Sequence, residues 1–428
     1  MLWQATPGRV PHLCTPLPGP RAQALIASDE QFTSPSYTRV YPLAVKSGAG
    51  CVIEDVDGNL FLDFTAGIAV TATGHCHPRI VAAIQQQAEQ LLHMSGTDFY
   101  YAPQSDLAKK LTQIAPGAGP KRVFFTNSGA ESVEAAFKLA RYHTKRQQMI
   151  AFRGAFHGRT MGALSLTGSK VTQRRGFQPL IPEVTHIEYS LAGIAMLEAI
   201  FKSTVPPEEV AAIIVEPIQG EGGYLVPPPE FHPQLKQIAE RHGILYIVDE
   251  VQSGMGRTGK MFAIEHWGIE PDILCLAKGL ASGMPLGAII AKSDVMDWPP
   301  GAHASTFGGN PVSCVAALET IALLEEELIE NATVVGAYLL DLLRGLQARL
   351  PQVIVEARGK GLMIGLEVTS GSLRDALIQA CFQRGLLLLG CGASAIRFCP
   401  PLVVSEAQCD TAVEIVEKAF TALLSQGE

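Results

Sequence analysis

Short apolar runs alternate with longer segments of helical spacing through the middle of this chain, and this alternation constrains the fold most. The runs are rich in β-branched residues and lack the polar alternation of a strand with one face in water. They are Val123–Thr126, Ala211–Val215, Ile244–Val248, Ile273–Leu276 and Ala288–Ile290. Strands of this kind are buried on both faces. The sequence therefore predicts an α/β fold with a mostly parallel sheet covered by helices.

The segments between the runs have the spacing of amphipathic helices. In residues 77–93, Ile80, Ile84 and Ala88 recur every four positions and form one apolar face. Residues 130–145 have a similar pattern. Alternating strands and helices predict βαβ units, whose strands end at a common edge of the sheet, where α/β proteins bind ligands.

The pattern changes near residue 315. An acid-rich helical stretch, residues 316–350, comes first, and the last helix begins with a capping box at Ser405. Between them we expect the strands Ile364–Val368, Leu386–Leu389 and Ile396–Cys399 and the helix Leu373–Arg384. Residues 40–75 contain turns, short strands and a hairpin signal at Asp57-Gly58, and are expected to pack on this C-terminal unit. The predicted parts are an N-terminal segment of residues 1–75, a large domain of residues 76–325 and a smaller α+β domain of residues 326–428.

Charge and cysteine content limit the expected partners. The 428 residues carry a net charge of −8 without a long basic run, which argues against nucleic-acid binding. Nine cysteines without a CxxC pair are typical of a reduced, cytoplasmic protein. His75, Cys76 and His77 stand together, but no second ligand cluster accompanies them, so we expect no metal site. The first twenty residues have no signal-peptide or membrane-spanning run, and predict a loose tail or an upstream start codon.

Two nucleotide-binding patterns fit this sequence poorly. Gly254–Gly259 matches GxGxxG, but five residues separate the preceding strand from the first glycine, and the acid at the expected distance, Asp272, begins a strand. The same stretch with Lys260 resembles a P-loop, but Met261 replaces the hydroxyl residue that holds Mg²⁺. We interpret it as a mobile glycine loop.

An acid and an amine follow neighbouring strands of the predicted sheet. Asp249 ends the strand ILYIVD, and Lys278 follows the strand DILCLA. Since the two strands are one crossover apart, both side chains are expected at one sheet edge. A carboxylate there can keep a pyridine nitrogen protonated, and an amine of lowered pKa can form an imine with an aldehyde.

Other motifs supply groups that such a cofactor needs. Residues 127–131, Asn-Ser-Gly-Ala-Glu, join a strand to a helix whose first amides can bind phosphate, although Ser128 alone would also serve as an N-cap. Phe156 can stack on a ring, and Arg159 can hold a carboxylate. Glu216 ends the apolar run AAIIVE, and Arg397 lies within the run IRFCP. A buried charge needs a partner, so we expect them to pair.

Together these residues resemble the class III aminotransferases, closest in motifs to the 4-aminobutyrate and acetylornithine aminotransferases. The likeness covers roughly residues 40–425. It rests on NSGAESVEAAFKLAR, FHGRT, EPIQGEGG, DEVQSGMGRTG, the segment around Lys278, and STFGGNP. It implies a pyridoxal 5'-phosphate (PLP) enzyme of fold type I, with a large domain around a mostly parallel sheet and a smaller α+β domain.

The resemblance also implies roles for individual residues. Lys278 would form the Schiff base and move the proton, and Asp249 would pair with the ring nitrogen. Val251 and Phe156 would contact the ring faces, and Gln252 would hydrogen-bond the ring hydroxyl. The other implied cofactor residues are Ser128, Gly129, Ala130, His157 and Thr306. Ala130 replaces a hydroxyl residue of several relatives, and Thr306 would come from a second subunit, which implies a homodimer, or a tetramer built from it.

The implied substrate residues match the 4-aminobutyrate group. Arg159 would bind the distal carboxylate of an ω-amino acid while Glu216 covers Arg397. When 2-oxoglutarate enters, Glu216 would move away and Arg397 would take its α-carboxylate. Ile68 matches a position that lines the pocket in that group.

The expected activity is ping-pong transamination from an ω-amino acid to 2-oxoglutarate. An amino-acid racemase or epimerase would use the same Lys278 and Asp249, and the cofactor motifs do not separate the two; the presence of both Arg159 and Glu216 favours transamination. An acetylornithine or ornithine aminotransferase is a further alternative, because it shares the arginines. A non-enzymatic binding module would be free to lose Lys278 or Asp249, and both are present.

Overall fold

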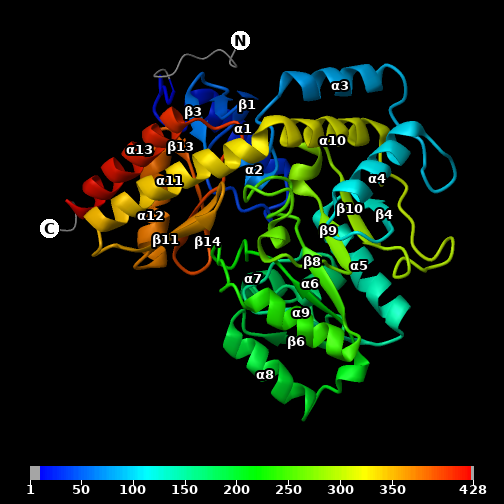
Figure 1. The fold of residues 1–428 in the computed structure, drawn as a ribbon. Coiled ribbons are helices and arrows are strands. Elements are labelled where there is room, and N and C mark those ends of the chain that lie inside the picture. The colour runs from blue at the N-terminus through cyan, green and yellow to red at the C-terminus, as the bar shows by residue number, and fades with distance from the viewer. Residues whose placement is uncertain (1–9, 426–428) are drawn as a thin grey trace.

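A computed structural model describes residues 10–425 of the chain. At its centre lies a seven-stranded sheet in which every strand except β10 points the same way (Figure 1). The strand order is β4 (Lys121–Thr126), β10 (Gly287–Lys292), β9 (Ile273–Leu276), β8 (Leu245–Asp249), β7 (Val210–Val215), β5 (Gln148–Phe152) and β6 (Val184–Ile187). Strand β10 is antiparallel to both β4 and β9. The prediction of an α/β fold with a mostly parallel sheet is confirmed.

Side chains on the sheet alternate between two hydrophobic clusters, one on each face. On β8, Tyr246 and Val248 enter one cluster, whereas Leu245 and Ile247 enter the other. One face is covered by α5 (Gly129–Thr144) and α6 (Met161–Leu166), and the other by α4 (Ala102–Ile114), α8 (Leu191–Phe201), α9 (Phe231–His242) and α10 (Pro311–Leu323). Burial on both faces explains why the strands read as continuous apolar runs.

Strands β5 and β6 complete the sheet but are absent from the strands predicted from the sequence. Strand β6, with the sequence Val-Thr-His-Ile, lies at the edge and is only partly buried, so its composition carries little apolar signal. Strand β5 is almost fully buried but short, and short apolar runs do not separate strands from buried helices.

The C-terminal unit is built on a second, fully antiparallel sheet. Its strands are β11 (Ile354–Lys360), β12 (Met363–Val368), β15 (Ala395–Phe398) and β14 (Leu389–Cys391), in that order. Its helices are α11 (Ile329–Arg349), α12 (Gly371–Phe382) and α13 (Glu406–Leu424). Ser405 and Gln408 form the predicted capping box at the start of α13. A turn of π-helix, Leu324–Leu328, joins α10 to α11, so the predicted domain boundary at residue 325 falls within a continuous helical element.

The N-terminal strands lie beside this C-terminal unit, as the blue and orange ribbons of Figure 1 show. The third sheet consists of β1 (Val45–Ala49), β2 (Val52–Asp55), β3 (Leu60–Asp63) and β13 (Leu386–Leu387). Strand β13 pairs parallel with β3, and the β2–β3 hairpin turns at Gly58, whose φ of 91° suits glycine. The boundaries of the three predicted parts stay predictions. The remaining helices are α2 (Ala66–Ala69), α3 (Pro78–Ala88) and α7 (Val171–Arg174).

The expected loose tail is wrong for the part of the N-terminus that the structure describes. His12 pairs with Leu60, and Asn59 accepts hydrogen bonds from the backbone of Cys14 and Thr15. Helix α1 (Pro20–Phe32) then begins on the carboxylate of Asp57, which accepts two of its first amides at 2.8 and 2.9 Å. Polar side chains of the β2–β3 turn hold the N-terminal segment in place. The composition of that segment does not reveal these contacts.

The structure adds three facts on cysteines, membranes and metals. All nine cysteines lie within residues 10–425, and none of them forms a disulfide. Over that same range no helix is long and apolar enough to cross a bilayer. Nor do the described residues bring together three His, Cys, Asp or Glu side chains in a way that could hold a metal ion. The cytoplasmic location stays a prediction.

Candidate active site

Lys278 and Asp249 lie at the carboxyl edge of the large sheet and line one pocket of about 420 Å³. Asp249 is the last residue of β8, and Lys278 follows the end of β9. The pocket also contains most of the predicted site residues, namely Ser128, Gly129, Ala130, Phe156, His157, Arg159, Glu216, Val251 and Gln252. Five separate loops at one sheet edge therefore bring these side chains together.

Three predicted site residues do not line this pocket. Ile68 is 47% exposed, and its neighbour Val70 lines the pocket instead. Thr306 lies on an exposed loop, and Arg397 is buried and does not line the pocket, although its charge acts on Lys278. Lining residues that sequence reasoning missed are Asn127, Gly158, Ala277, Gly283, Met284, Pro285 and Leu286. Asn127, Gly158 and Ala277 flank predicted residues, whereas the turn before β10, residues 283–286, is a separate segment without a chemical signal.

The carboxylate of Asp249 is buried and held from two directions. Its Oδ2 lies 2.7 Å from Nδ1 of His157, and its Oδ1 accepts a hydrogen bond from the amide of Val251 at 3.0 Å. Burial alone would lower the pKa of His157, but the hydrogen bond and charge of Asp249, with the charge of Glu216, raise it. A histidine that favours its charged form pairs with Asp249 and fixes its direction, which suits a partner for a protonated ring nitrogen.

Lys278 is set up to present an uncharged amine. Removal from water lowers its pKa, and the positive charge of Arg397 acts in the same direction, although Asp249 and Glu216 oppose the change. Its backbone has a φ of 35°, in the left-handed region that non-glycine residues rarely occupy. A lowered pKa increases the fraction of amine able to attack an aldehyde.

The start of helix α5 leaves two backbone amides for an anion. Ser128 caps the helix, its Oγ accepting from the amide of Glu131 at 3.2 Å, and its carbonyl oxygen accepts from the amide of Ser132. The first two amides, of Gly129 and Ala130, have no such partner among the described residues. The N-cap role and the phosphate role considered for this motif are therefore compatible, because they use different atoms.

The surroundings of these amides fit a flat ring with a phosphate. Val251 and Phe156 both face the pocket that contains Asp249. A Cβ on Gly129 would lie 2.7 Å from Cγ1 of Val251, so only glycine lets this loop approach that side chain. Gly158 is equally restricted, since its Cβ would lie 2.7 Å from Cβ of Ala130 and its φ is 138°. The pocket accordingly accommodates the ring, the phosphate and the aldehyde of the cofactor that the resemblance implies.

Glu216 lines the pocket and is bound to backbone groups. Its carboxylate accepts hydrogen bonds from the amide of Phe156 at 3.3 Å and of Gly220 at 3.2 Å. Burial raises its pKa to about 7; Asp249 adds to this effect, and His157 and the two amides oppose it. Through its two hydrogen bonds, Glu216 connects the loop that carries Phe156 to the loop that follows β7.

The expected pairing of Glu216 with Arg397 is wrong. The buried guanidinium of Arg397 lies 3.4 Å from Oε2 of Glu221. Glu221 also contacts Lys170 at 2.5 Å, so it joins two cations. The motif EPIQGEGG contains both glutamates, and only the tertiary structure reveals which of them reaches Arg397 on β15. Glu216 does not reach it, because backbone amides at its own sheet edge bind its carboxylate.

The glycine loop at residues 254–259, which the sequence predicted to be mobile, is almost entirely buried. A Cβ on Gly256 would lie 2.7 Å from Leu324, and one on Gly361 would lie 2.7 Å from the amide of Gly259. Arg257 donates hydrogen bonds to the carbonyls of Leu362 and Pro400. The glycines thus let this loop pack between the large sheet and the C-terminal unit.

Comparisons of the sequence and the fold with known proteins identify a family. The family described as aminotransferase class-III matches residues 33–420. An acetylornithine aminotransferase of Methanosarcina acetivorans is 41% identical over 94% of this chain and 98% of its own length. An alanine/serine racemase of Pyrococcus horikoshii is 38% identical over 97% of this chain and 94% of its own. The ornithine aminotransferase structure from Toxoplasma gondii ME49 has a TM-score of 0.88 and 33% identity, and covers 95% of this chain and 96% of the other.

The raised pKa of Glu216 predicts a pH-dependent gain in stability for Glu216→Gln. The wild-type carboxyl is protonated in the fold up to about pH 7, but it ionises in the unfolded chain near its ordinary value of 4.5. Native stability therefore falls as pH rises through this window, by up to about 3 kcal/mol at 1.36 kcal/mol per pKa unit. The amide variant has no such loss.

Thermal unfolding of the cofactor-free protein between pH 5 and pH 8 checks this prediction. The midpoint temperature of unfolding of Glu216→Gln, minus that of wild type, should increase steadily from pH 5 to pH 8. Glu208→Gln, at an exposed side chain, serves as the control and should show no trend. A constant difference between Glu216→Gln and wild type would mean that water reaches the carboxyl.

Proposed function

The chain belongs to the class III aminotransferases, whose cofactor is PLP, and from that premise we propose that it moves the terminal amino group of an ω-amino acid to 2-oxoglutarate. The observation that carries this proposal is the placement of two arginines around Lys278. Arg159 lines the pocket with an exposed guanidinium, and Arg397 is buried and covered by Glu221. A carboxylate can thus be held at one end of the substrate or at the other, according to whether Arg397 is covered.

The side chains of the pocket have separable tasks. PLP supplies the aldehyde that accepts the amino group and the ring that draws electrons from the reacting carbon. We assign Lys278 the proton transfer at that carbon and Asp249 the charge on the ring nitrogen. Gly129 and Ala130 would donate their amides to the phosphate, with Ser128 holding the loop, while Phe156 and Val251 orient the ring.

Substrate choice follows from which arginine is free. Arg159 would bind the distal carboxylate of the ω-amino acid while Glu221 neutralises Arg397. For 2-oxoglutarate, Glu221 would turn towards Lys170, which it already contacts, and leave Arg397 for the α-carboxylate. Glu216, to which the sequence prediction gave this role, would instead hold the Phe156 loop. Ile68 would contact the substrate only at the mouth of the pocket, because it is half exposed.

Racemisation of an α-amino acid is the second candidate. The alanine/serine racemase of Pyrococcus horikoshii aligns with 97% of this chain, so this likeness extends beyond residues 33–420, which the family matches. Lys278 could take part in removing the proton of the α carbon and in returning one to the opposite face, without a second substrate. Among aminotransferases, acetylornithine and ornithine are donors to compare with 4-aminobutyrate, since the relatives include enzymes named for both.

A donor screen separates these functions. The PLP-loaded protein is incubated with 4-aminobutyrate, acetylornithine, ornithine, lysine, leucine, alanine or serine, with and without 2-oxoglutarate, and products are resolved by chirality. We expect glutamate to form only when a terminal-amine donor and 2-oxoglutarate are both present. Conversion of a single α-amino acid to its mirror image without 2-oxoglutarate would overturn transamination in favour of racemisation.

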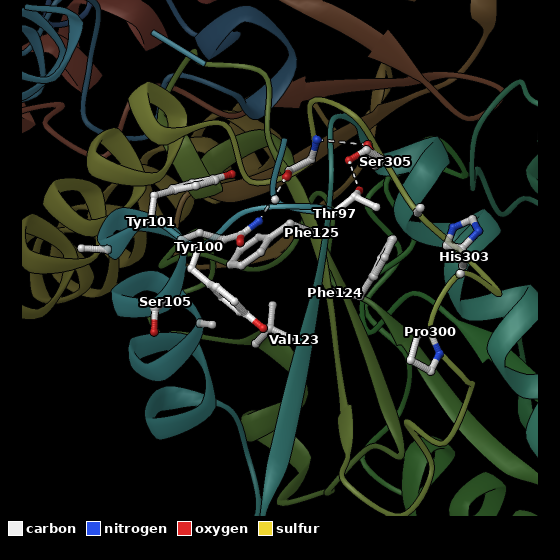
Figure 2. A pocket seen from close by; sticks show the side chains of 17 residues that line it. Thr97, Tyr100, Tyr101, Ser105, Val123, Phe124, Phe125, Pro300, His303 and Ser305 are labelled. Atoms are coloured by element: carbon white, nitrogen blue, oxygen red, sulfur yellow. Dashed lines mark hydrogen bonds between the residues drawn. The ribbon is translucent and has the colours of Figure 1, made fainter. Parts of the chain in front are cut away.

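We further propose that the enzyme is a homodimer in which Thr306 reaches the phosphate end of the partner's site. A cavity of about 750 Å³ opens beside the Thr306 loop, away from Lys278. Figure 2 shows Tyr100 and Tyr101 on one side of it and Pro300 and His303 on the other, with Phe124 of β4 between them. Next to the cavity, Phe99, Tyr100 and Phe307 expose large apolar surfaces, which is typical of a protein interface.

A mixing experiment tests the shared site. Lys278→Ala and Thr306→Arg proteins are each expected to be inactive alone. In a mixed dimer one site receives both an intact Lys278 and an intact Thr306, so random mixing after co-expression should restore activity to about a quarter of the sites. A mixture as inactive as its components, in protein shown to be dimeric, would contradict the exchange of Thr306.

A further inference from the structure

One end of the Gln252 side chain is occupied and the other end is free. Its Oε1 accepts a hydrogen bond of 2.9 Å from the hydroxyl of Tyr224. Its Nε2 makes no hydrogen bond to the described residues, although Gln252 lines the pocket that contains Lys278. The two N–H groups of the amide are therefore available to a molecule bound in the pocket.

Tyr224 is held rigidly enough to impose this orientation. The residue is fully buried, with a φ of 53°, and it packs in an apolar cluster with Ile218, Cys391 and Cys399. Arg358 fixes its backbone by donating to the carbonyls of Gly223 at 2.6 Å and Tyr224 at 3.3 Å. Burial also keeps the pKa of Tyr224 well above its ordinary value, against the charge of Arg397, so the hydroxyl stays a donor.

The space around the amide is limited on its other side by Gly220. A Cβ at this position would collide with Nε2 of Gln252. Glycine leaves room for this end of the side chain, and the hydroxyl of Tyr224 donates to the oxygen at the opposite end. The hydrogen bond from Tyr224 therefore sets the orientation of the amide, and Gly220 keeps the space of its NH₂ group open.

We infer that Tyr224 is a positioning residue for the cofactor: its hydroxyl fixes the Gln252 amide with Nε2 towards the pocket, where it donates to the ring oxygen of PLP. A flipped amide would present a carbonyl oxygen there and could only accept. The inference rests on the cofactor site of the proposed function, and it holds whichever amino donor the enzyme uses.

Tyr224→Phe tests this by the pH titration of the visible absorption band of the PLP-loaded protein. A donated N–H stabilises the negative form of the ring oxygen, so a loosened amide should raise the pKa of this chromophore by about 0.5 to 1. Tyr246→Phe is the matched control: it is equally buried, its hydroxyl contacts His232 at 2.8 Å, and it does not line the pocket. It should leave the titration unchanged.

A double-mutant cycle separates orientation of the amide from general support of the fold. In a Gln252→Met background no amide remains to be oriented, so adding Tyr224→Phe should produce no further change. Gly220→Ala, whose Cβ displaces the amide directly, should raise the pKa as Tyr224→Phe does and gives a second route if the phenylalanine variant misfolds.

Two results would overturn the inference: an unchanged pKa in both Tyr224→Phe and Gly220→Ala, or the same increase on adding Tyr224→Phe in the Gln252→Met background as in wild type. Failure of the wild-type protein to show any cofactor band is a different outcome, because it would refute the proposed function itself.

Discussion

The carboxylate of Asp249 is buried at the end of β8, and the candidate active site is organised around it. Burying a carboxylate is costly unless it is paired and hydrogen-bonded. His157 supplies the partner and the amide of Val251 supplies a second donor, so the side chain is held in a fixed direction. The sheet contributes the rest, because parallel strands end at one edge and bring the loop of Lys278 to the same pocket.

The hairpin that follows β7, with Gln219 and Leu225 paired at its base, connects the two ends of the site. Glu221 of this hairpin contacts Arg397, where a substrate carboxylate is expected, and Tyr224 contacts Gln252 beside the cofactor position. Arg358 fixes the backbone between them. In the proposed function, substrate recognition and cofactor orientation would both depend on this one short segment. Glu216, which follows the end of β7, holds the neighbouring Phe156 loop by a hydrogen bond.

Much of this arrangement could be predicted from the sequence. Continuous apolar runs identified five strands of the sheet, and residues directly after such runs, Asp249 and Lys278 among them, had to lie at its carboxyl edge. Local patterns failed where the deciding contact is long-range. The choice between Glu221 and Glu216 depends on how a hairpin meets β15, and the order in the N-terminal segment depends on Asn59 and Asp57. Tyr224 gave no signal, since a buried tyrosine in a loop is not distinctive until its hydroxyl is seen to meet Gln252.

The central claim is that the amine of Lys278 forms the covalent link to PLP beside Asp249. Borohydride reduction of the PLP-loaded protein, followed by proteolysis and mass spectrometry of the peptides, tests it most directly. We predict that the reduced cofactor is found on the peptide that contains Lys278, and that Lys278→Ala protein yields no labelled peptide. Label on a different lysine, or equal labelling of the Lys278→Ala protein, would contradict the account.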